Sequence, residues 1–192
     1  KIDKKSALVQ KIKDKVDRQY AEGRTTSFGD NELEMIVKDA DYKAYAALCA
    51  TDVHQVTMGV MNSRPPAPLG HEASGTIVEI GEEAARAGYK VGDKVTLFPV
   101  SHCGECEWCK KGMEQYCINS KGTGAFAEYI VTDVKTVYRL PDDADLKEYA
   151  IVEPTNCCLR AMDLAPVRHG ATVCVAGVGG IGSIMLNQIL LS

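Results

Sequence analysis

The sequence lacks any apolar run long enough to span a lipid bilayer, and its start, KIDKKSALVQ, lacks the apolar core of a secretory signal peptide. It also lacks an excess of positive charge, because its formal net charge is -4. These absences give no reason to expect a membrane or a nucleic acid as a partner. We therefore expect a cytoplasmic protein, in a compartment where thiols stay reduced.

Internal repeats and low-complexity tracts are also missing. Hydrophobic residues make up 45% and charged residues 25% of the 192 residues, which is typical of a globular chain. This length accommodates one ordinary domain, or one domain and part of a second.

The cysteines are unevenly distributed, since half of the 8 fall within CGECEWCKKGMEQYC, residues 103–117. These four are Cys103, Cys106, Cys109 and Cys117, spaced C-x2-C-x2-C-x7-C. Zn²⁺ binds four thiolates as a tetrahedron, and short spacings let one tight loop supply three of them. We predict a closed structural zinc site, with disulfides or free thiols as the alternative. A nucleic-acid-binding knuckle is disfavoured, because nearby glutamates offset Lys110 and Lys111.

Short apolar or alternating runs predict strands at residues 42–48, 74–81, 93–100, 125–131 and 136–141. Many short strands with turn signals indicate a β-rich, barrel-like domain. The pattern then changes, because 148–165 favours a helix and 171–192 favours a strand, a glycine turn and a helix. We therefore predict two domains, residues 1–154 and 155–192. Before residue 42 we expect strands at SALVQ and LEMIV, and either a short helix or a charged hairpin at KIKDKVDRQYAEG.

Three further segments carry chemically useful side chains. CATDVH (49–54) and GHEASG (70–75) are weak signals alone, because a lone cysteine usually packs in a core and a His-Glu pair usually lies at a surface. GVGGIG (177–182) fits G-x-G-x-x-G, follows an apolar strand pattern and precedes an apolar helix pattern. In that context the glycines allow a dinucleotide pyrophosphate to approach the helix N-terminus. The predicted cofactor contacts are Gly177, Gly179, Gly180, Ile181 and Gly182.

Four of these motifs together resemble, in family order, the zinc-dependent medium-chain dehydrogenase/reductase (alcohol dehydrogenase) superfamily: CATDVH, GHEASGTIVEIGEEA, CGECEWCKKGMEQYC and VAGVGGIG. AIVEPTNCCLRA is similar to a segment of its polyol and threonine dehydrogenases. The resemblance implies a mixed α+β and α/β fold, in which a GroES-like β-barrel catalytic domain precedes the first strand, turn and helix of a Rossmann domain. It also implies an oxidoreductase that transfers a hydride between a small-molecule alcohol or polyol and NAD or NADP.

The same resemblance implies a catalytic Zn²⁺ beside the structural one. Its implied ligands are Cys49, His71, Glu72 and Glu153, and whether Glu72 or Glu153 is the resting ligand stays open. Cys157 and Cys158 are rivals that we expect to be buried small residues.

A proton route is implied as well. Thr51 would pass the proton of the alcohol to His54, which would release it, since an imidazole can both accept and donate a proton. Asp52 would orient the imidazole of His71.

The sequence ends soon after the glycine turn, so the residue about 20 positions on that selects NAD or NADP is absent. We therefore expect a fragment that is inactive alone, from a full-length protein that forms a homo-oligomer, dimer or tetramer. The alternative function is a non-catalytic scaffold of the same fold, which would hold only the zinc of the cysteine cluster.

Overall fold

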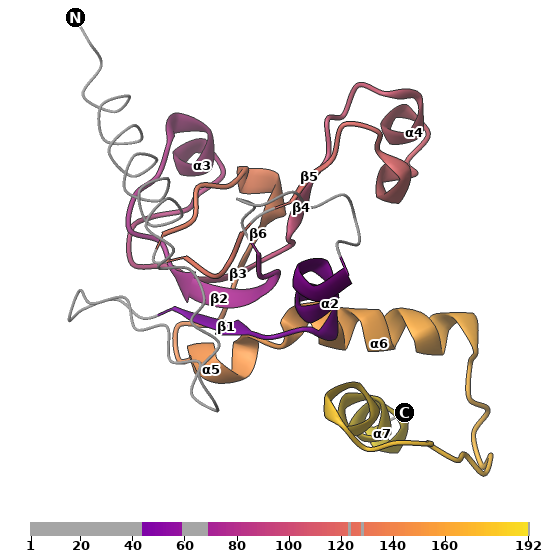
Figure 1. Cartoon of the computed structure of the whole chain (residues 1–192). Coiled ribbons are helices and arrows are strands. Elements are labelled where there is room, and N and C mark those ends of the chain that lie inside the picture. Colours follow the sequence, from indigo (N-terminus) through magenta and orange to yellow (C-terminus); the bar gives the residue numbers. More distant parts are fainter. Residues whose placement is uncertain (1–43, 59–68, 123, 128, 192) are drawn as a thin grey trace, which may run out of the picture. The chain divides into compact units, whose positions relative to one another are not determined.

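The computed structural model describes residues 44–58, 69–122, 124–127 and 129–191 (Figure 1). Its contacts divide the chain into two compact units, the first ending at Ala150 and the second beginning at Ile151. Within the described ranges, no helix combines the length and the apolar character needed to cross a bilayer. The segments predicted before residue 42 lie outside the described residues, and the domain boundary at 154/155 stays a prediction.

The first unit is built on a four-stranded antiparallel sheet of order β1-β2-β3-β6. The strands are β1 (Tyr45–Ala47), β2 (Glu72–Thr76), β3 (Lys94–Leu97) and β6 (Val137–Arg139). Strands β1, β3 and β6 lie within predicted strands, with shorter bounds. Strand β2 overlaps the prediction at 74–81 only over 74–76, because it begins two residues earlier. Ser74 lies opposite Tyr45 on one side and Thr96 on the other. Ser74 and Thr96 are both buried. Their side chains donate to backbone carbonyls of Leu146 and Ala73, so the buried hydroxyls are satisfied.

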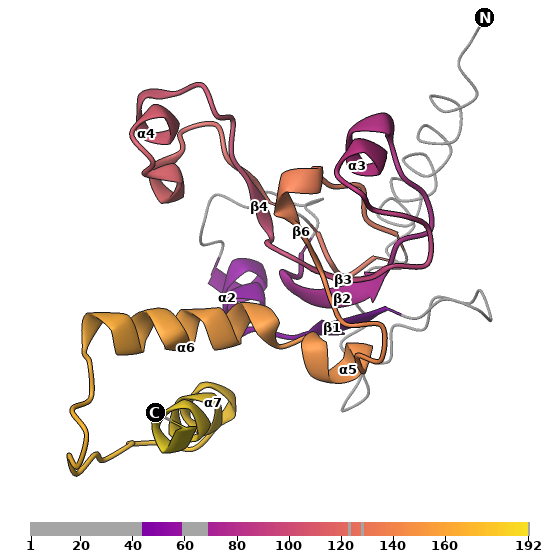
Figure 2. The same cartoon turned by 180° about the vertical axis from the view of Figure 1, so that it is seen from behind.

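The core of this unit lies beside the sheet. Leu140, Ala144 and Leu146 form a buried apolar cluster, with Tyr45 and Tyr149 packed against it. Helix α5 (Leu146–Tyr149) supplies part of the cluster and packs on β1 and β2, as the reverse view shows (Figure 2). Burying one leucine side chain contributes about 1.5–3 kcal/mol, so this cluster stabilises the sheet.

Two α-helices and a 3₁₀ turn adjoin the strands of this sheet in the chain. Helix α3 (Glu82–Arg86) lies between β2 and β3 in the chain, and helix α2 (Ala50–Met58) follows β1. A 3₁₀ turn, η3 (Val134–Thr136), precedes β6 and begins at Asp133, whose side chain accepts from the backbone N–H of Lys135. This is the usual way in which an aspartate satisfies an otherwise free N–H at a helix start.

The strand predicted at 125–131 is wrong for the described part of that range, which runs as an irregular segment. Its backbone contacts include two hydrogen bonds, from Ala125 N–H to Gly70 C=O and from Phe126 N–H to Leu69 C=O, each 2.9 Å long. Ala125, Phe126 and Ala127 are nonetheless buried. Their apolar character therefore reflects burial rather than a sheet.

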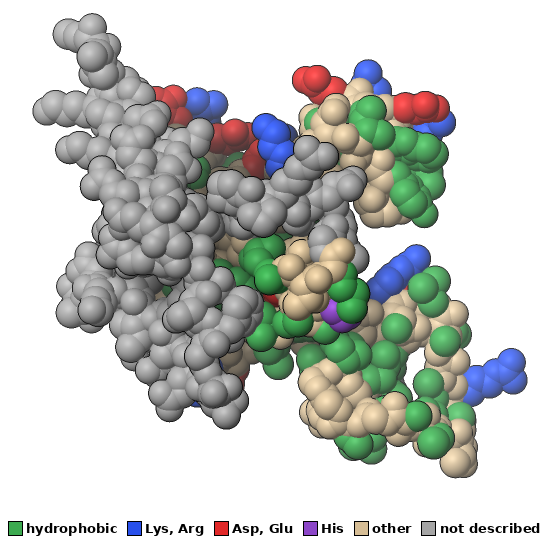
Figure 3. Space-filling model, viewed as in Figure 1, with side chains coloured by type: hydrophobic (Ala, Val, Ile, Leu, Met, Phe, Trp, Pro, Cys, Tyr) green, Lys and Arg blue, Asp and Glu red, His purple; other side chains and the backbone are tan. Residues whose placement is uncertain are grey.

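A lobe projects from the strand pair β4 (Val100–Ser101) and β5 (Lys121–Gly122). It contains helix α4 (Glu107–Lys110) and the 3₁₀ turn η2 (Glu114–Tyr116), as Figure 1 shows. Hydrophobic side chains gather on its outer surface beside charged ones (Figure 3), in agreement with the exposure of Trp108, Tyr116 and Ile118. A segment that buries so few apolar side chains needs another source of stability.

The second unit contains helices α6 (Val152–Leu164) and α7 (Gly180–Leu191). The predicted helix at 148–165 is confirmed, and Pro154 lies in the first turn of α6, where its missing N–H costs nothing. Cys158 is buried as expected and donates to Ile181 C=O, whereas the expected burial of Cys157 is wrong because that side chain is exposed. Residues 171–176, predicted as a strand, pair with no strand in the described part of the chain. A strand forms only where a neighbour supplies hydrogen-bond partners.

Candidate metal centres

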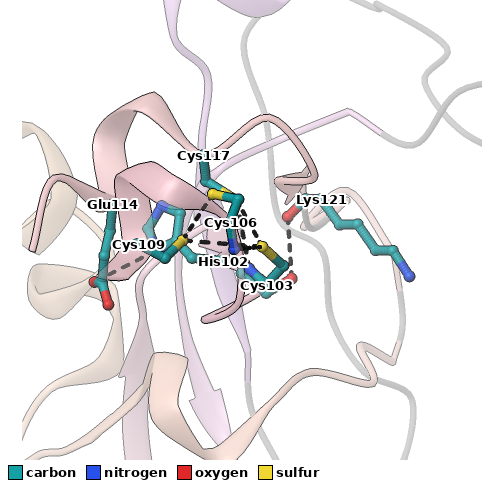
Figure 4. A network of polar contacts seen from close by, with 8 residues as sticks. His102, Cys103, Cys106, Cys109, Glu114, Cys117 and Lys121 are labelled. Atoms are coloured by element: carbon teal, nitrogen blue, oxygen red, sulfur yellow. Dashed lines mark hydrogen bonds and ion pairs between the residues drawn. The ribbon is translucent and has the colours of Figure 1, made fainter. Parts of the chain in front are cut away.

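The four clustered cysteines converge in the lobe. Their sulfur atoms all lie within 4.8 Å of one another, as Figure 4 shows. The Sγ–Sγ distance is 3.5 Å for Cys106–Cys109 and 3.6 Å for Cys103–Cys117. Four thiolates at the usual Zn–S length would be separated by about 3.8 Å. The spacing therefore fits a four-coordinate Zn²⁺.

The local backbone explains this convergence. Gly104 and Gly112 have φ of 72° and 70°, a left-handed conformation that other residues adopt at a cost. The N–H groups of Glu105 and Cys106 lower the pKa of Cys103 to about 6, whereas desolvation raises the pKa of Cys109 to about 12. Without a metal the thiols are thus unequal. A bound dication would favour the thiolate form at every one of them.

Polar contacts of neighbouring side chains also lie in the lobe. His102 Nδ1 lies 3.7 Å from Glu114 Oε2, and Ser101 Oγ donates to Lys121 C=O across the strand pair (Figure 4). All 8 cysteines of the chain lie within the described ranges, and all are free. The disulfide alternative thus has no counterpart in the structure.

A second group of potential ligands lies at the sheet. Atoms of Cys49, His71 and Glu72 all lie within 4.8 Å of one another. Cys49 lies between β1 and α2, His71 precedes β2, and Glu72 is its first residue. Because Ala47 pairs with Glu72 in an antiparallel register, the chain just after β1 faces the chain just before β2. This pairing brings a thiol, an imidazole and a carboxylate together, a set that suits a catalytic zinc with an open position.

Asp52 connects the two chain segments of this site. Its side chain is fully buried. Oδ1 accepts from Gly70 N–H at 3.0 Å and lies 3.2 Å from His71 Nδ1. Oδ2 accepts from Cys49 N–H at 3.1 Å. A carboxylate on Nδ1 leaves Nε2 as the metal-binding atom of the ring.

The pKa values follow from this network. Burial alone raises the pKa of Asp52, but hydrogen bonds from His71 and the backbone outweigh it, so the pKa is lowered. The hydrogen bond with Asp52 raises the pKa of His71 to about 9. A metal at Nε2 would compete with that proton.

Thr51 and His54, predicted to move a proton, both lie on α2. Thr51 is half-buried and His54 is exposed. Residues three apart on a helix lie on the same face, so Thr51 and His54 share one face of α2. Their role in moving a proton stays a prediction.

Glu153, the fourth predicted ligand, lies in the second unit, in the first turn of α6. There its Oε1 accepts from Cys157 Sγ at 3.6 Å. The first unit by itself supplies Cys49, His71 and Glu72.

The predicted glycine turn leads into α7. Gly177 has φ of 95°, and an atom at the Cβ position of Gly182 would lie 1.9 Å from the Gly177 carbonyl oxygen. Both positions therefore require glycine. Gly179 and Gly180 have nothing within 4 Å of their Cβ positions, which leaves space beside the N-terminus of α7, where Ile181 is also exposed.

Comparison with known proteins identifies the family. The sequence profile of the alcohol dehydrogenase GroES-like domain matches residues 42–142. The chain therefore belongs to the alcohol dehydrogenase family with a GroES-like domain, and the predicted family and fold class are confirmed.

Two curated bacterial relatives illustrate the similarity. The chain is 35% identical over 160 residues to a sorbitol dehydrogenase of Halalkalibacterium halodurans, covering 80% of this chain and 44% of that protein. It is 34% identical over 148 residues to 2-dehydro-3-deoxy-L-galactonate 5-dehydrogenase of Pseudoalteromonas atlantica, covering 73% and 42%. The chain thus spans less than half the length of these relatives. The predicted resemblance to polyol dehydrogenases is confirmed by these matches.

A solved structure shares the fold. CAD from Helicobacter pylori, complexed with NADP(H), superposes with a TM-score of 0.68 at 26% identity, over 78% of this chain and 46% of that one.

Sequence reasoning missed two residues beside the second site. Gly70 supplies an N–H to Asp52, and Phe126 packs against Gly70. Gly70 could have been found from the sequence, because it directly precedes the candidate ligand His71. Nothing in the sequence indicated that Phe126 reaches a point 56 positions earlier in the chain.

Proposed function

We propose that this chain is the metal-binding part of a zinc-dependent, NAD(P)-dependent dehydrogenase that oxidises an alcohol or polyol. The observation that carries the proposal is the convergence of Cys49, His71 and Glu72 on one point, separate from the cluster of four cysteines. The substrate class draws support from the similarity to a sorbitol dehydrogenase.

The two centres have different chemistry. Four cysteine ligands would leave no open position, so a metal there would hold the lobe together. Cys49, His71 and Glu72 as ligands would leave a fourth position for a substrate oxygen, and Glu153 is the alternative to Glu72. Zn²⁺ bound there would supply Lewis acidity toward that oxygen.

The remaining residues of the site orient the metal ligands and transfer the substrate proton. Asp52 holds the ring of His71 and the backbone of Cys49. Thr51 accepts the substrate hydroxyl proton and passes it toward His54, whose exposure opens a route to water. The buried carboxylate of Asp52 keeps His71 oriented while the proton leaves.

The second unit would bind the cofactor. Gly177 and Gly182 hold the turn, and Gly179, Gly180 and Ile181 lie next to it at the start of α7. N–H groups at a helix N-terminus attract a pyrophosphate. We assign residues 1–154 to the catalytic domain and 155–192 to the dinucleotide-binding domain, and expect the whole protein to be a homo-oligomer.

Metal analysis tests the proposal. The purified chain should hold about two zinc ions, and Cys49→Ser about one. Cys174→Ser, an exposed cysteine outside both clusters, is the matched control and should keep both. In the whole protein, Cys49→Ser should abolish NAD(P)-dependent polyol oxidation. Unchanged turnover in Cys49→Ser would show that Cys49 is not a ligand of the catalytic metal. Only one zinc in the unsubstituted chain would favour the non-catalytic scaffold instead.

A further inference from the structure

The Gly70 peptide, which directly precedes His71, is held from two sides. Its N–H donates to Asp52 Oδ1 at 3.0 Å, the same oxygen that contacts the His71 ring. Its C=O accepts from Ala125 N–H at 2.9 Å, and the preceding C=O, of Leu69, accepts from Phe126 N–H at 2.9 Å. The buried segment 125–127 thus clamps the residues that lead into the candidate ligand.

Phe126 is the side chain of this clamp. It is only 3% exposed. An atom at the Cβ position of Gly70 would lie 2.7 Å from Phe126 Cδ1 and 2.8 Å from its Cγ. The Phe126 backbone N also lies 2.7 Å from that position, so the ring and the backbone of Phe126 together occupy the space that any other residue at position 70 would need. Because Gly70 also has φ of 87°, its backbone cannot relax toward an ordinary conformation without moving His71.

Phe126 is not a member of the main apolar cluster of the unit, which comprises Leu140, Ala144 and Leu146. Its burial therefore comes from contacts outside that cluster, and these include the Gly70 peptide. Protein interiors are densely packed, so removing the ring would leave a void against the Gly70 peptide rather than a collapsed wall.

We propose that Phe126 is a positioning residue for the candidate catalytic metal centre, acting through Gly70 to hold His71 against Asp52 and toward Cys49. This inference rests on the proposed function of that centre. It assigns the buried segment 125–127 a role in metal affinity and ligand geometry, in addition to packing.

Co²⁺ titration of the whole 192-residue chain tests the proposal, because thiolate-bound Co²⁺ has visible absorption bands that report ligand type and geometry. Phe126→Ala should weaken the Cys49–His71–Glu72 site on the order of 10-fold and shift its bands, as loss of supporting contacts around a ligand does. The four-cysteine site of the same molecule should bind Co²⁺ unchanged. Phe126→Leu, which keeps bulk but loses the flat ring, should fall between Phe126→Ala and the unsubstituted chain.

Leu140→Ala is the matched control, because it removes a buried side chain of the same unit that belongs to the main apolar cluster and to neither candidate metal centre. It should lower the midpoint of urea unfolding without changing Co²⁺ affinity or bands. Equal weakening by Leu140→Ala, or full affinity and unchanged bands in Phe126→Ala, would overturn the proposal. If Phe126→Ala does not fold, Phe126→Leu provides the test. A Co²⁺ spectrum of Phe126→Leu identical to that of the unsubstituted chain would then refute the proposal.

Failure of the proposed function gives a different result. In that case the unsubstituted chain itself takes up only the Co²⁺ of the four cysteines, and this inference falls with it.

Discussion

Asp52 Oδ1 lies 3.2 Å from His71 Nδ1, although the two residues are 19 positions apart in the chain. The other carboxylate oxygen accepts from the N–H of Cys49. One fully buried side chain therefore fixes both a candidate thiolate ligand and a candidate imidazole ligand. Hydrogen bonds to a charged group contribute about 1.5–3 kcal/mol each, so this arrangement is stable before a metal binds.

Asp52→Asn should weaken metal binding at the Cys49–His71–Glu72 site by about 10–100-fold and leave the four-cysteine site unaffected. The neutral amide cannot accept all three hydrogen bonds, because one of its two positions is a donor. Zinc competition with a chromophoric chelator measures the two affinities separately.

Asp93→Asn provides the matched control. Asp93 is also buried and accepts from Arg139 and from the N–H of Lys90, but it contacts none of the candidate ligands. This variant should lose stability and keep both metal affinities. Equal effects of the two substitutions on zinc affinity would contradict the connecting role of Asp52.

The metal-free chain should be less stable at alkaline pH. The hydrogen bond with Asp52 raises the pKa of His71 to about 9, so the native state holds this proton more tightly than the unfolded chain does. The contribution is complete below the unfolded pKa of about 6.5 and is lost as the pH rises toward the native value. Urea unfolding with a chelator present, at several pH values, should show this decline.

His71→Asn separates this effect from thiol ionisation, which occurs in the same pH range. The difference in unfolding free energy between the native chain and the variant should shrink from pH 6.5 upward. A difference that is constant across the range would show that His71 has an ordinary pKa.

Gly70→Ala should destabilise the first unit more than Gly88→Ala does. Both glycines have nearly the same φ, 87° and 86°, but only Gly70 has a neighbour, Phe126, within reach of an added Cβ. Gly88→Ala thus measures the backbone cost alone, about 1–2 kcal/mol. Gly70→Ala adds a steric overlap, and chemical denaturation of the two variants gives the difference. Equal losses would mean that Phe126 moves aside freely.

Cys109→Ser should unfold the lobe locally, because the energy of a structural zinc site is folding energy. The single tryptophan of the chain, Trp108, lies in α4 next to this cysteine and reports the change by fluorescence. Hydrogen exchange should rise across residues 103–117 and not in the sheet. An unchanged exchange pattern with zinc removed would show that the lobe folds without metal.

The sequence predicted the convergence of the four clustered cysteines well and the sheet in part. Strands around Ser74, Thr96 and Tyr138 follow from alternating apolar patterns, and the structure places them in one sheet. The interpretation of 125–131 as a strand failed, because a short apolar run looks the same whether it joins a sheet or packs in a core. The run at 171–176 has no strand partner among the described residues, and a hydrogen-bonded ladder requires one.

The sequence by itself determined the cluster of four cysteines, because ligands separated by a few residues are brought together by one loop whatever surrounds it. Only the tertiary structure decided how Cys49 meets His71 and Glu72, since that requires β1 to pair with β2 in one register. The contact between Phe126 and Gly70 is even harder to predict from the sequence, because it depends on where a distant irregular segment packs. Local spacing fixes local chelation, whereas a site assembled from distant segments exists only once the sheet has formed.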